Sequence, residues 1–150
     1  MPFTPSHAVV ALPFVRTRLM PAAIAVGAMT PDLPLFVRAL PLSYGATHDL
    51  ALMPATALVA LALLLVWRAL LRPAARELAP RWLAARLPPA WDAEVMTGVR
   101  ETITLRGRAG PSWEGAAMLA LSLAVGIISH IAWDLFTHEG RWGVRALPVL

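Results

Sequence analysis

The chain has 150 residues, enough for one domain, but 58% of them are hydrophobic and only 15% are charged. The mean hydropathy of +0.63 excludes an ordinary soluble globular protein and indicates a chain whose solvent is the lipid bilayer. Cysteine is absent, which excludes disulfides and thiolate ligands. The net charge of +4 comes from arginines that lie between apolar blocks and form no dense basic tract, so we expect no nucleic-acid partner.

The first segment, residues 1–34, is predicted to form a short helical hairpin. Its apolar stretch is interrupted by Arg16 and Arg18. A single span would hold both arginines inside the membrane at a cost of about 3 kcal/mol or more each, whereas a hairpin places them in water at its turn. We therefore predict one helix over residues 6–15 and a second over residues 19–29.

Two later segments have the length and purity of membrane spans. Residues 50–66 carry no charge, and a helix over residues 50–71, with Arg68 reaching toward the interface, is long enough to cross about 30 Å of hydrocarbon. Residues 115–133 also lack a formal charge, which predicts a second span over residues 113–138.

An arginine-rich loop, residues 72–112, joins the two spans. From Arg68 onward this region holds eight arginines against four acidic residues, so the positive-inside tendency places it in the cytoplasm. Residues 74–87 suit an amphipathic surface helix interrupted at Pro80, although a solvated linker fits the pattern equally well. The predicted fold is thus an all-α, polytopic helical membrane protein, a single domain over residues 1–150 in the bacterial inner membrane.

This topology brings the polar residues of the apolar segments to one face of the membrane. If the loop and the hairpin turn are both inside, each span and each hairpin arm ends outside at a histidine or an aspartate. The face that we expect to be extracytoplasmic therefore collects His7, Asp32, His48, His130 and His138.

The second span carries the most suggestive spacing. His130, Asp134 and His138 are four residues apart, so their side chains can lie along one face of a helix. Neutral imidazole and carboxylate are suitable ligands for a divalent cation, and ionisable residues inside a membrane are costly unless they serve a function. A structural ion pair between a histidine and Asp134 is the simpler alternative.

His48 precedes the first span and has polar neighbours on both sides. Thr47 and Asp49 are candidates to fix the tautomer of the His48 ring by hydrogen bonding. Taken alone, however, a histidine such as His7 or His48 in an apolar chain is more often a hydrogen-bonded interface residue than a metal ligand. The case for a metal therefore rests on the whole set.

Four motifs together resemble the domain-of-unknown-function 4184 family of bacterial membrane proteins. They are the opening MPFTPSHA of residues 1–8, GAMTPDLP at 27–34, Thr47-His48, and SHIAWDLFTH at 129–138. The motifs are also similar to those of membrane-bound metal-dependent hydrolases and, more distantly, of the zinc-dependent phospholipase C and P1 nuclease group. Because members of the family usually continue through further spans, we expect a truncated or minimal member.

The resemblance implies a helical membrane protein with one metal site. Its ligands would be the following six residues: His7, Asp32, His48, His130, Asp134 and His138. One or two divalent ions, with zinc favoured, would occupy the site. The resemblance does not supply a substrate.

From these observations the chain is expected to be a membrane-embedded metal-dependent hydrolase acting on phosphoesters in a lipid or other amphiphile. Asp32 and Asp134 are the candidate catalytic residues, since either carboxylate could serve as a base in place of a ligand. Arg38 or Arg141 could hold a phosphate. Two alternatives stay open, namely a non-enzymatic protein with a structural metal or polar site and a haem protein with two histidine ligands. A homo-oligomer is also compatible with the sequence.

Overall fold

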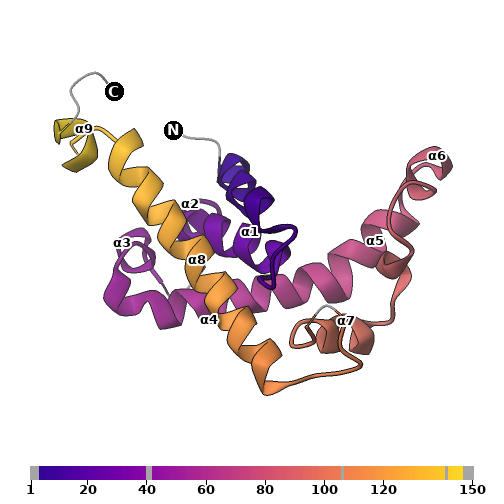
Figure 1. Cartoon of the computed structure of the whole chain (residues 1–150). Coiled ribbons are helices and arrows are strands. Elements are labelled where there is room, and N and C mark those ends of the chain that lie inside the picture. The colour runs from indigo at the N-terminus through magenta and orange to yellow at the C-terminus, as the bar shows by residue number, and fades with distance from the viewer. Residues whose placement is uncertain (1–3, 40–41, 106, 141, 147–150) are drawn as a thin grey trace.

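The computed structural model of the protein describes residues 4–39, 42–105, 107–140 and 142–146. Within these ranges every regular element is a helix and no strand is present, which confirms the predicted all-α class. Two long helices, α4 (Met53–Val66) and α8 (Trp113–Thr137), cross each other, and the shorter elements pack around them (Figure 1).

The chain begins with two helices packed side by side, η1 (Thr4–Phe14) and α1 (Pro21–Met29), with Arg16 and Arg18 in the turn between them. Helix η1 is a 3-10 helix, in which residues three apart are stacked directly above one another. Helix α1 starts at a proline, whose fixed φ angle suits the first helical position and whose missing N–H costs nothing there.

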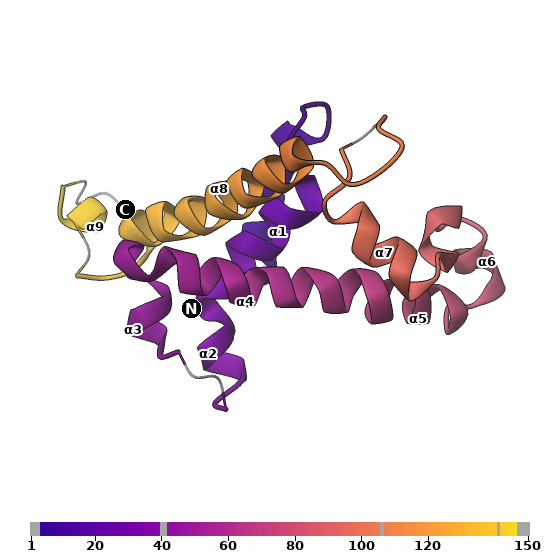
Figure 2. The ribbon, with the colours of Figure 1, turned by 90° about the horizontal axis from the view of Figure 1, so that it is seen from below.

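A compact turn of short helices follows α1 and leads into the first long helix (Figure 2). Its elements are η2 (Thr30–Asp32), α2 (Leu33–Phe36), α3 (Tyr44–Thr47) and η3 (Leu50–Leu52). Helices η2 and α2 each have a proline in their first two positions, where proline favours the start of a helix and prevents a preceding helix from continuing. The turn therefore stays short, and it holds its polar side chains close to α1.

Helix α4 is part of a longer continuous helix. It runs on through a π-helical turn, η4 (Trp67–Leu71), into α5 (Arg72–Glu77), so that the whole helical stretch covers Leu50–Glu77. This 28-residue stretch and α8, with 25 residues, are both long and apolar enough to cross a membrane. Only 17% of the most apolar window of the first is buried inside the protein, so most of its apolar surface is available to lipid or to a partner.

The arginine-rich region between the long helices is itself largely helical. It contains α5, α6 (Arg81–Ala84), η5 (Pro89–Asp92) and α7 (Val95–Glu101). Helices α5 and α6 lie on either side of Pro80. An ion pair of 2.7 Å between Arg76 Nε and Asp92 Oδ1 ties α5 to η5.

Helices α1 and α8 pack closely over an extensive contact, and two glycines allow it. A Cβ atom on Gly126 would lie 2.3 Å from the carbonyl oxygen of Ile24, and one on Gly27 would lie 2.6 Å from that of Leu123. Small residues of this kind let two helix backbones approach directly. The crossing presses the C-terminal half of α8 against the end of α1, where the turn of short helices begins.

The buried core lies where α1, α4 and α8 meet. Its fully or almost fully buried apolar side chains include Ala23, Ala60, Leu64, Leu119 and Leu123. Beyond the core, α8 ends at Thr137, the chain reverses at Gly140, whose φ of +78° suits a glycine, and α9 (Trp142–Ala146) packs back on α8.

Candidate metal centre

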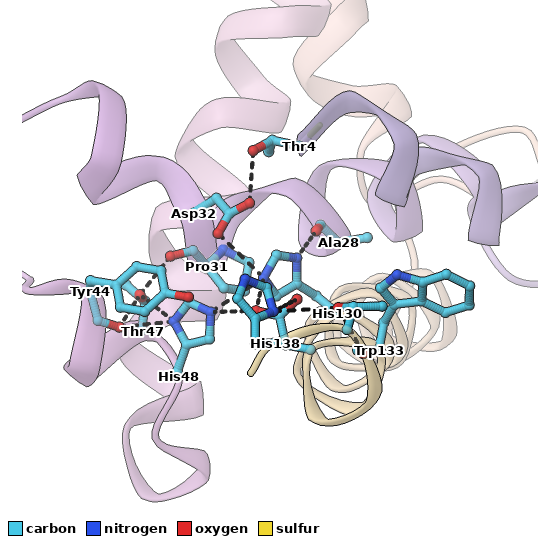
Figure 3. A network of polar contacts seen from close by, with 12 residues as sticks. Thr4, Ala28, Pro31, Asp32, Tyr44, Thr47, His48, His130, Trp133 and His138 are labelled. Carbon is cyan, nitrogen blue, oxygen red and sulfur yellow. Dashed lines mark hydrogen bonds and ion pairs between the residues drawn. The ribbon is translucent and has the colours of Figure 1, made fainter. Parts of the chain in front are cut away.

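Four acidic and imidazole side chains from three parts of the chain converge beside the crossing of α1 and α8. Asp32 ends η2, His48 follows α3, and His130 and Asp134 lie one turn apart on α8. Each offers one ligand atom, and these atoms all lie within 4.8 Å of one another. Figure 3 shows Asp32, His48 and His130 close together. This four-residue cluster could hold a metal ion. Because the three parts are far apart in sequence, the cluster exists only in the folded chain.

The backbone of α1 fixes the ring of His130. This ring is almost completely buried, and its Nδ1 atom lies 2.7 Å from the carbonyl oxygen of Ala28. A carbonyl oxygen can only accept a hydrogen bond, so Nδ1 must carry the proton. In the neutral ring the Nε2 atom then presents a lone pair to the cluster. The close crossing at Gly126, one turn earlier on α8, brings the ring within reach of α1.

The His48 ring is fixed in the same way by its own turn. Its Nδ1 atom lies 2.8 Å from the carbonyl oxygen of Tyr44, and the two rings pack with their centroids 4.0 Å apart. The buried Thr47 hydroxyl lies 2.7 Å from the carbonyl oxygen of Pro31 and so ties this turn to η2. His48 therefore also turns the lone pair of its Nε2 toward the cluster.

Four hydrogen-bond acceptors consequently face one another. The two Nε2 atoms of His48 and His130 are 3.3 Å apart, and Asp134 Oδ2 lies 3.3 Å from the first and 3.4 Å from the second. Asp32 Oδ1 lies 3.5 Å from the Nε2 of His130. With both imidazoles neutral, none of these atoms can donate a hydrogen bond to another. A proton would relieve one contact, whereas a divalent cation would bind all four atoms and neutralise both carboxylates.

A hydroxyl group orients Asp32. Thr4 donates a hydrogen bond of 2.7 Å to Asp32 Oδ2, which leaves Oδ1 directed toward His130 (Figure 3). The stacking of residues three apart in η1 places Thr4 and His7 on the same side of that helix. Sequence reasoning missed Thr4. No sequence signal points to it, because its position beside Asp32 depends on the 3-10 form of η1 and on the packing of η1 against α1.

The two remaining predicted ligands lie next to the four-residue cluster. The His7 ring packs on that of His130 with centroids 4.2 Å apart, and its buried Nε2 atom has no hydrogen-bond partner among the described residues. His138 follows the last residue of α8, and its half-buried ring places Nδ1 3.5 Å from Asp134 Oδ1. The role of these two histidines as ligands stays a prediction. The orphaned His7 nitrogen fits a group that the described chain does not itself provide.

Other predicted polar residues have different positions. Asp49 caps η3 by accepting a hydrogen bond of 2.8 Å from the Ala51 N–H, so it does not fix the His48 ring as the sequence suggested. The Tyr44 carbonyl oxygen has that role, and the hydroxyl of Thr47, the other predicted partner, lies 3.4 Å from the same Nδ1 atom. A backbone carbonyl group has no signature in the sequence. Arg38 is exposed after α2, and Arg141 lies outside the described residues.

The geometry disfavours the haem alternative. Two histidines that ligate one haem iron stand on opposite faces of a wide macrocycle. Here the two Nε2 atoms are 3.3 Å apart and the carboxylates of Asp32 and Asp134 flank them, in the space that the macrocycle would require. The arrangement of the cluster suits a small cation.

Fold and site together define an all-helical protein with two potential membrane helices and a buried cluster of His and Asp side chains that could hold a metal ion. The chain matches the family described as Domain of unknown function (DUF4184) over residues 1–150, and it belongs to that family. No curated protein and no solved structure matches the chain.

Proposed function

We propose that this protein is a multi-pass protein of the bacterial inner membrane that hydrolyses phosphoester bonds in a lipid or other amphiphile with the help of a bound divalent metal. The observation that carries the proposal is the convergence of four acceptor atoms within 4.8 Å of one another, with both imidazole tautomers set by backbone carbonyl groups. Such an arrangement is stable only when a cation or protons compensate it.

The ligand set favours zinc. Imidazole nitrogens and carboxylate oxygens match the borderline character of Zn²⁺, and a catalytic zinc takes three protein ligands and keeps one open position, for which His48, His130 and Asp32 would suffice. Two carboxylates also balance the charge of one divalent ion. His7 and His138 border the cluster, and a second ion would need these two histidines as additional ligands.

The residues would divide the chemistry among them. A bound divalent ion supplies Lewis acidity, which makes water a nucleophile near neutral pH and polarises a phosphoryl oxygen. His48 and His130 would hold the ion, and Thr4 would keep Asp32 in the orientation of a ligand. Asp134 would act as the general base, because its Oδ1 atom is buried and makes no hydrogen bond within the described chain.

A groove beside the cluster supports an amphiphilic substrate. It has a volume of about 390 Å³ and lies between η1 and α8, where it reaches the buried His7 ring. Apolar side chains, among them Val10 and Trp133, form most of its wall, while the hydroxyl groups of Ser6 and Ser129 add polar sites. Grooves of this character bind molecules with an apolar body and a polar end.

The positions of the arginines support an extracytoplasmic metal site. Arg16 and Arg18 lie in the turn between η1 and α1, and Arg108 lies in the segment before α8. All three belong to one depression at the end of the molecule away from the cluster. Because cytoplasmic segments carry the excess of arginine, this end would face the cytoplasm and the cluster would face outward.

A structural metal site is the second candidate function. The observation that favours it is the ligand count, since four protein ligands close a tetrahedral zinc site, whereas a catalytic site leaves one position open. The two functions differ in the role of Asp134. If it is a base, three ligands remain to hold the ion. If it is a ligand, the ion and the packing of α8 depend on it.

A hydrolysis assay tests the proposal. Detergent-purified protein is incubated with a phospholipid and with a soluble phosphodiester that releases a coloured alcohol. We expect turnover that a chelator removes and that added Zn²⁺ restores. Asp134→Asn should lower the rate by at least about a hundredfold, as loss of a general base does, while much of the bound metal is retained.

Asp49→Asn is the matched control, because the same substitution is made at an aspartate that only caps η3. It should leave turnover unchanged. Catalysis at the cluster would be ruled out if the zinc-loaded wild type hydrolysed both substrates no faster than the Asp134→Asn variant. Loss of both metal and folded structure in Asp134→Asn would favour the structural site instead.

A further inference from the structure

A second polar site lies at the other end of the molecule, and we call it the basic pocket. It has a volume of about 210 Å³, and its polar lining includes Arg18, Arg68, Glu101 and Thr104. The pocket lies where the end of the first long helix and the segment after α7 come close to the turn between η1 and α1. Glu114, which pairs with Arg18, is 16 residues before His130 on α8 (130 − 114), or about 24 Å along the helix.

The positive charge in this region exceeds the negative charge that the chain provides. Arg72 Nη1 lies 2.9 Å from Glu101 Oε2, so Glu101 already has one guanidinium partner. Arg68 borders the same pocket as Glu101, and its buried Nη1 atom has no hydrogen-bond partner among the described residues. Arg72 is itself 92% buried, and its Nε and Nη2 atoms also lack partners there.

Buried guanidinium groups with unused donors are costly, because each donor has lost its water without gaining an acceptor. One carboxylate between two arginines leaves a net positive charge in the site. An anion in the pocket would accept from Arg68, whose donor is unused, and would offset the charge of Arg72 behind it, and arginine is well suited to phosphate oxygens. Charge complementarity therefore identifies the ligand as a phosphate group.

Local structure places Arg68 at the pocket. Arg68 lies in the π-helical turn η4, an irregularity that often marks functional sites. Helix α7 packs directly against this turn, and a Cβ atom on Gly98 would lie 2.9 Å from the Arg68 carbonyl oxygen. The glycine lets α7 approach closely enough to bring Glu101 to both arginines.

The surroundings favour a phosphate that is attached to a lipid. Ala22 borders both the basic pocket and an apolar groove of about 510 Å³ that follows α1 between α1 and α4. Val26, Leu63 and Trp67 line this groove. The nine residues of α1 rise by about 14 Å, close to half of the 30 Å hydrocarbon thickness, which is the depth of one leaflet. The basic pocket and the groove would thus be adjoining sites for the head group and one acyl chain of the same lipid.

We propose that the basic pocket binds the phosphate of an anionic phospholipid, with one acyl chain in the adjoining groove along α1. The phosphate site shares no residue with the metal cluster and does not depend on the hydrolase activity, while the far end of the groove reaches Thr4, which bonds to Asp32. It holds the head group between the turn that follows η1, Arg68 and the segment after α7, on the side of the membrane opposite to the cluster.

Lipid binding to the detergent-purified full chain tests this inference. Native mass spectrometry and the Tm are measured with added phosphatidylglycerol, phosphatidylcholine and inorganic phosphate. The wild type should retain one phosphatidylglycerol in preference to phosphatidylcholine, with a higher Tm. Arg68→Gln should weaken phosphatidylglycerol binding by about tenfold or more, as loss of a charged hydrogen-bond donor does. The matched control Arg86→Gln, at an exposed arginine on another segment, should bind like the wild type.

Thr104→Glu provides a second variant in case Arg68→Gln does not fold. It places a negative charge in the pocket from the segment after α7 and should also abolish the preference for phosphatidylglycerol. An unchanged preference in a folded variant at either position would overturn the proposal. The same Tm rise with inorganic phosphate alone would overturn the assignment to a lipid. Metal content should be the same in all variants, which separates this site from the cluster.

Discussion

At the scale of single residues, backbone carbonyl groups determine the chemistry of the cluster. Ala28 and Tyr44 each offer a carbonyl oxygen to the Nδ1 atom of a histidine, which leaves both Nε2 atoms as acceptors. Hydrogen bonds of this kind orient metal ligands and raise their basicity. A side-chain change around the cluster can therefore alter metal affinity without removing a ligand.

Thr4 offers the clearest case. Thr4→Val keeps the shape of the side chain but removes the hydrogen bond to Asp32. We expect zinc affinity to fall by about 10-fold to 100-fold, as for other residues that orient a ligand, with the Tm of the metal-free protein little changed. Competition with a coloured zinc chelator measures the affinity.

Thr17→Val is the control, since the exposed Thr17 hydroxyl bonds only to backbone in the turn after η1. It should bind zinc as the wild type does. Equal zinc affinity in Thr4→Val and Thr17→Val would show that the orientation of Asp32 does not matter for the metal.

The sequence is informative about these residues where charge interrupts apolar segments. Together with the predicted topology, the i, i+4 spacing and the family resemblance, this predicted six ligands, and the structure brings four of them, Asp32, His48, His130 and Asp134, together in a cluster that could hold a metal ion. The carbonyl partners and Thr4 could not be predicted, because backbone groups are present at every position and a threonine is common in any loop. Their roles arise only from tertiary contacts.

At the scale of helices, the crossing of α1 and α8 positions the cluster. Gly126 is one turn before His130, and its missing side chain sets the distance between the two helices. A Gly126→Val change would push a side chain into the backbone of α1. Packed helices cannot relax around a clash with backbone, so we expect a loss of about 3 kcal/mol or more of unfolding free energy, together with loss of bound metal.

Thermal unfolding and metal content of Gly126→Val should be compared with those of Ala120→Val. Ala120 lies on an exposed face of the same helix, so the control adds a β-branched residue to α8 without entering the crossing. Retention of the metal and Tm in Gly126→Val would mean that the close helix contact does not build the site.

The sequence predicted the helices that long uncharged runs determine. It did not predict the helical features that depend on tertiary contacts. Both potential membrane helices follow from long uncharged runs, and the structure contains helices there that are long and apolar enough. The 3-10 form of η1 and the π turn at Trp67–Leu71 have no such signature. The direct contact of Gly27 and Gly126 also has no signature in the sequence, because glycines are also common at helix ends and in turns.

At the scale of the whole molecule, the proposed topology makes a separate prediction. Reporter fusions at Ala90, in η5, and at the C-terminus should fall on opposite sides of the membrane, because one span, α8, lies between them. An alkaline phosphatase reporter should be active at the C-terminus and inactive at Ala90. The extracytoplasmic placement of the cluster would be contradicted if the reporter were active only at Ala90, or if its activity were the same at both positions.

The central claim is that the four-residue cluster binds a metal, and elemental analysis of the detergent-purified protein tests it most directly. The wild type and Asp49→Asn should each contain about one equivalent of a transition metal, zinc above all, whereas Asp32→Asn and His130→Ala should lose most of it. A wild type without a bound transition metal, or a metal content unchanged by both Asp32→Asn and His130→Ala, would contradict the account.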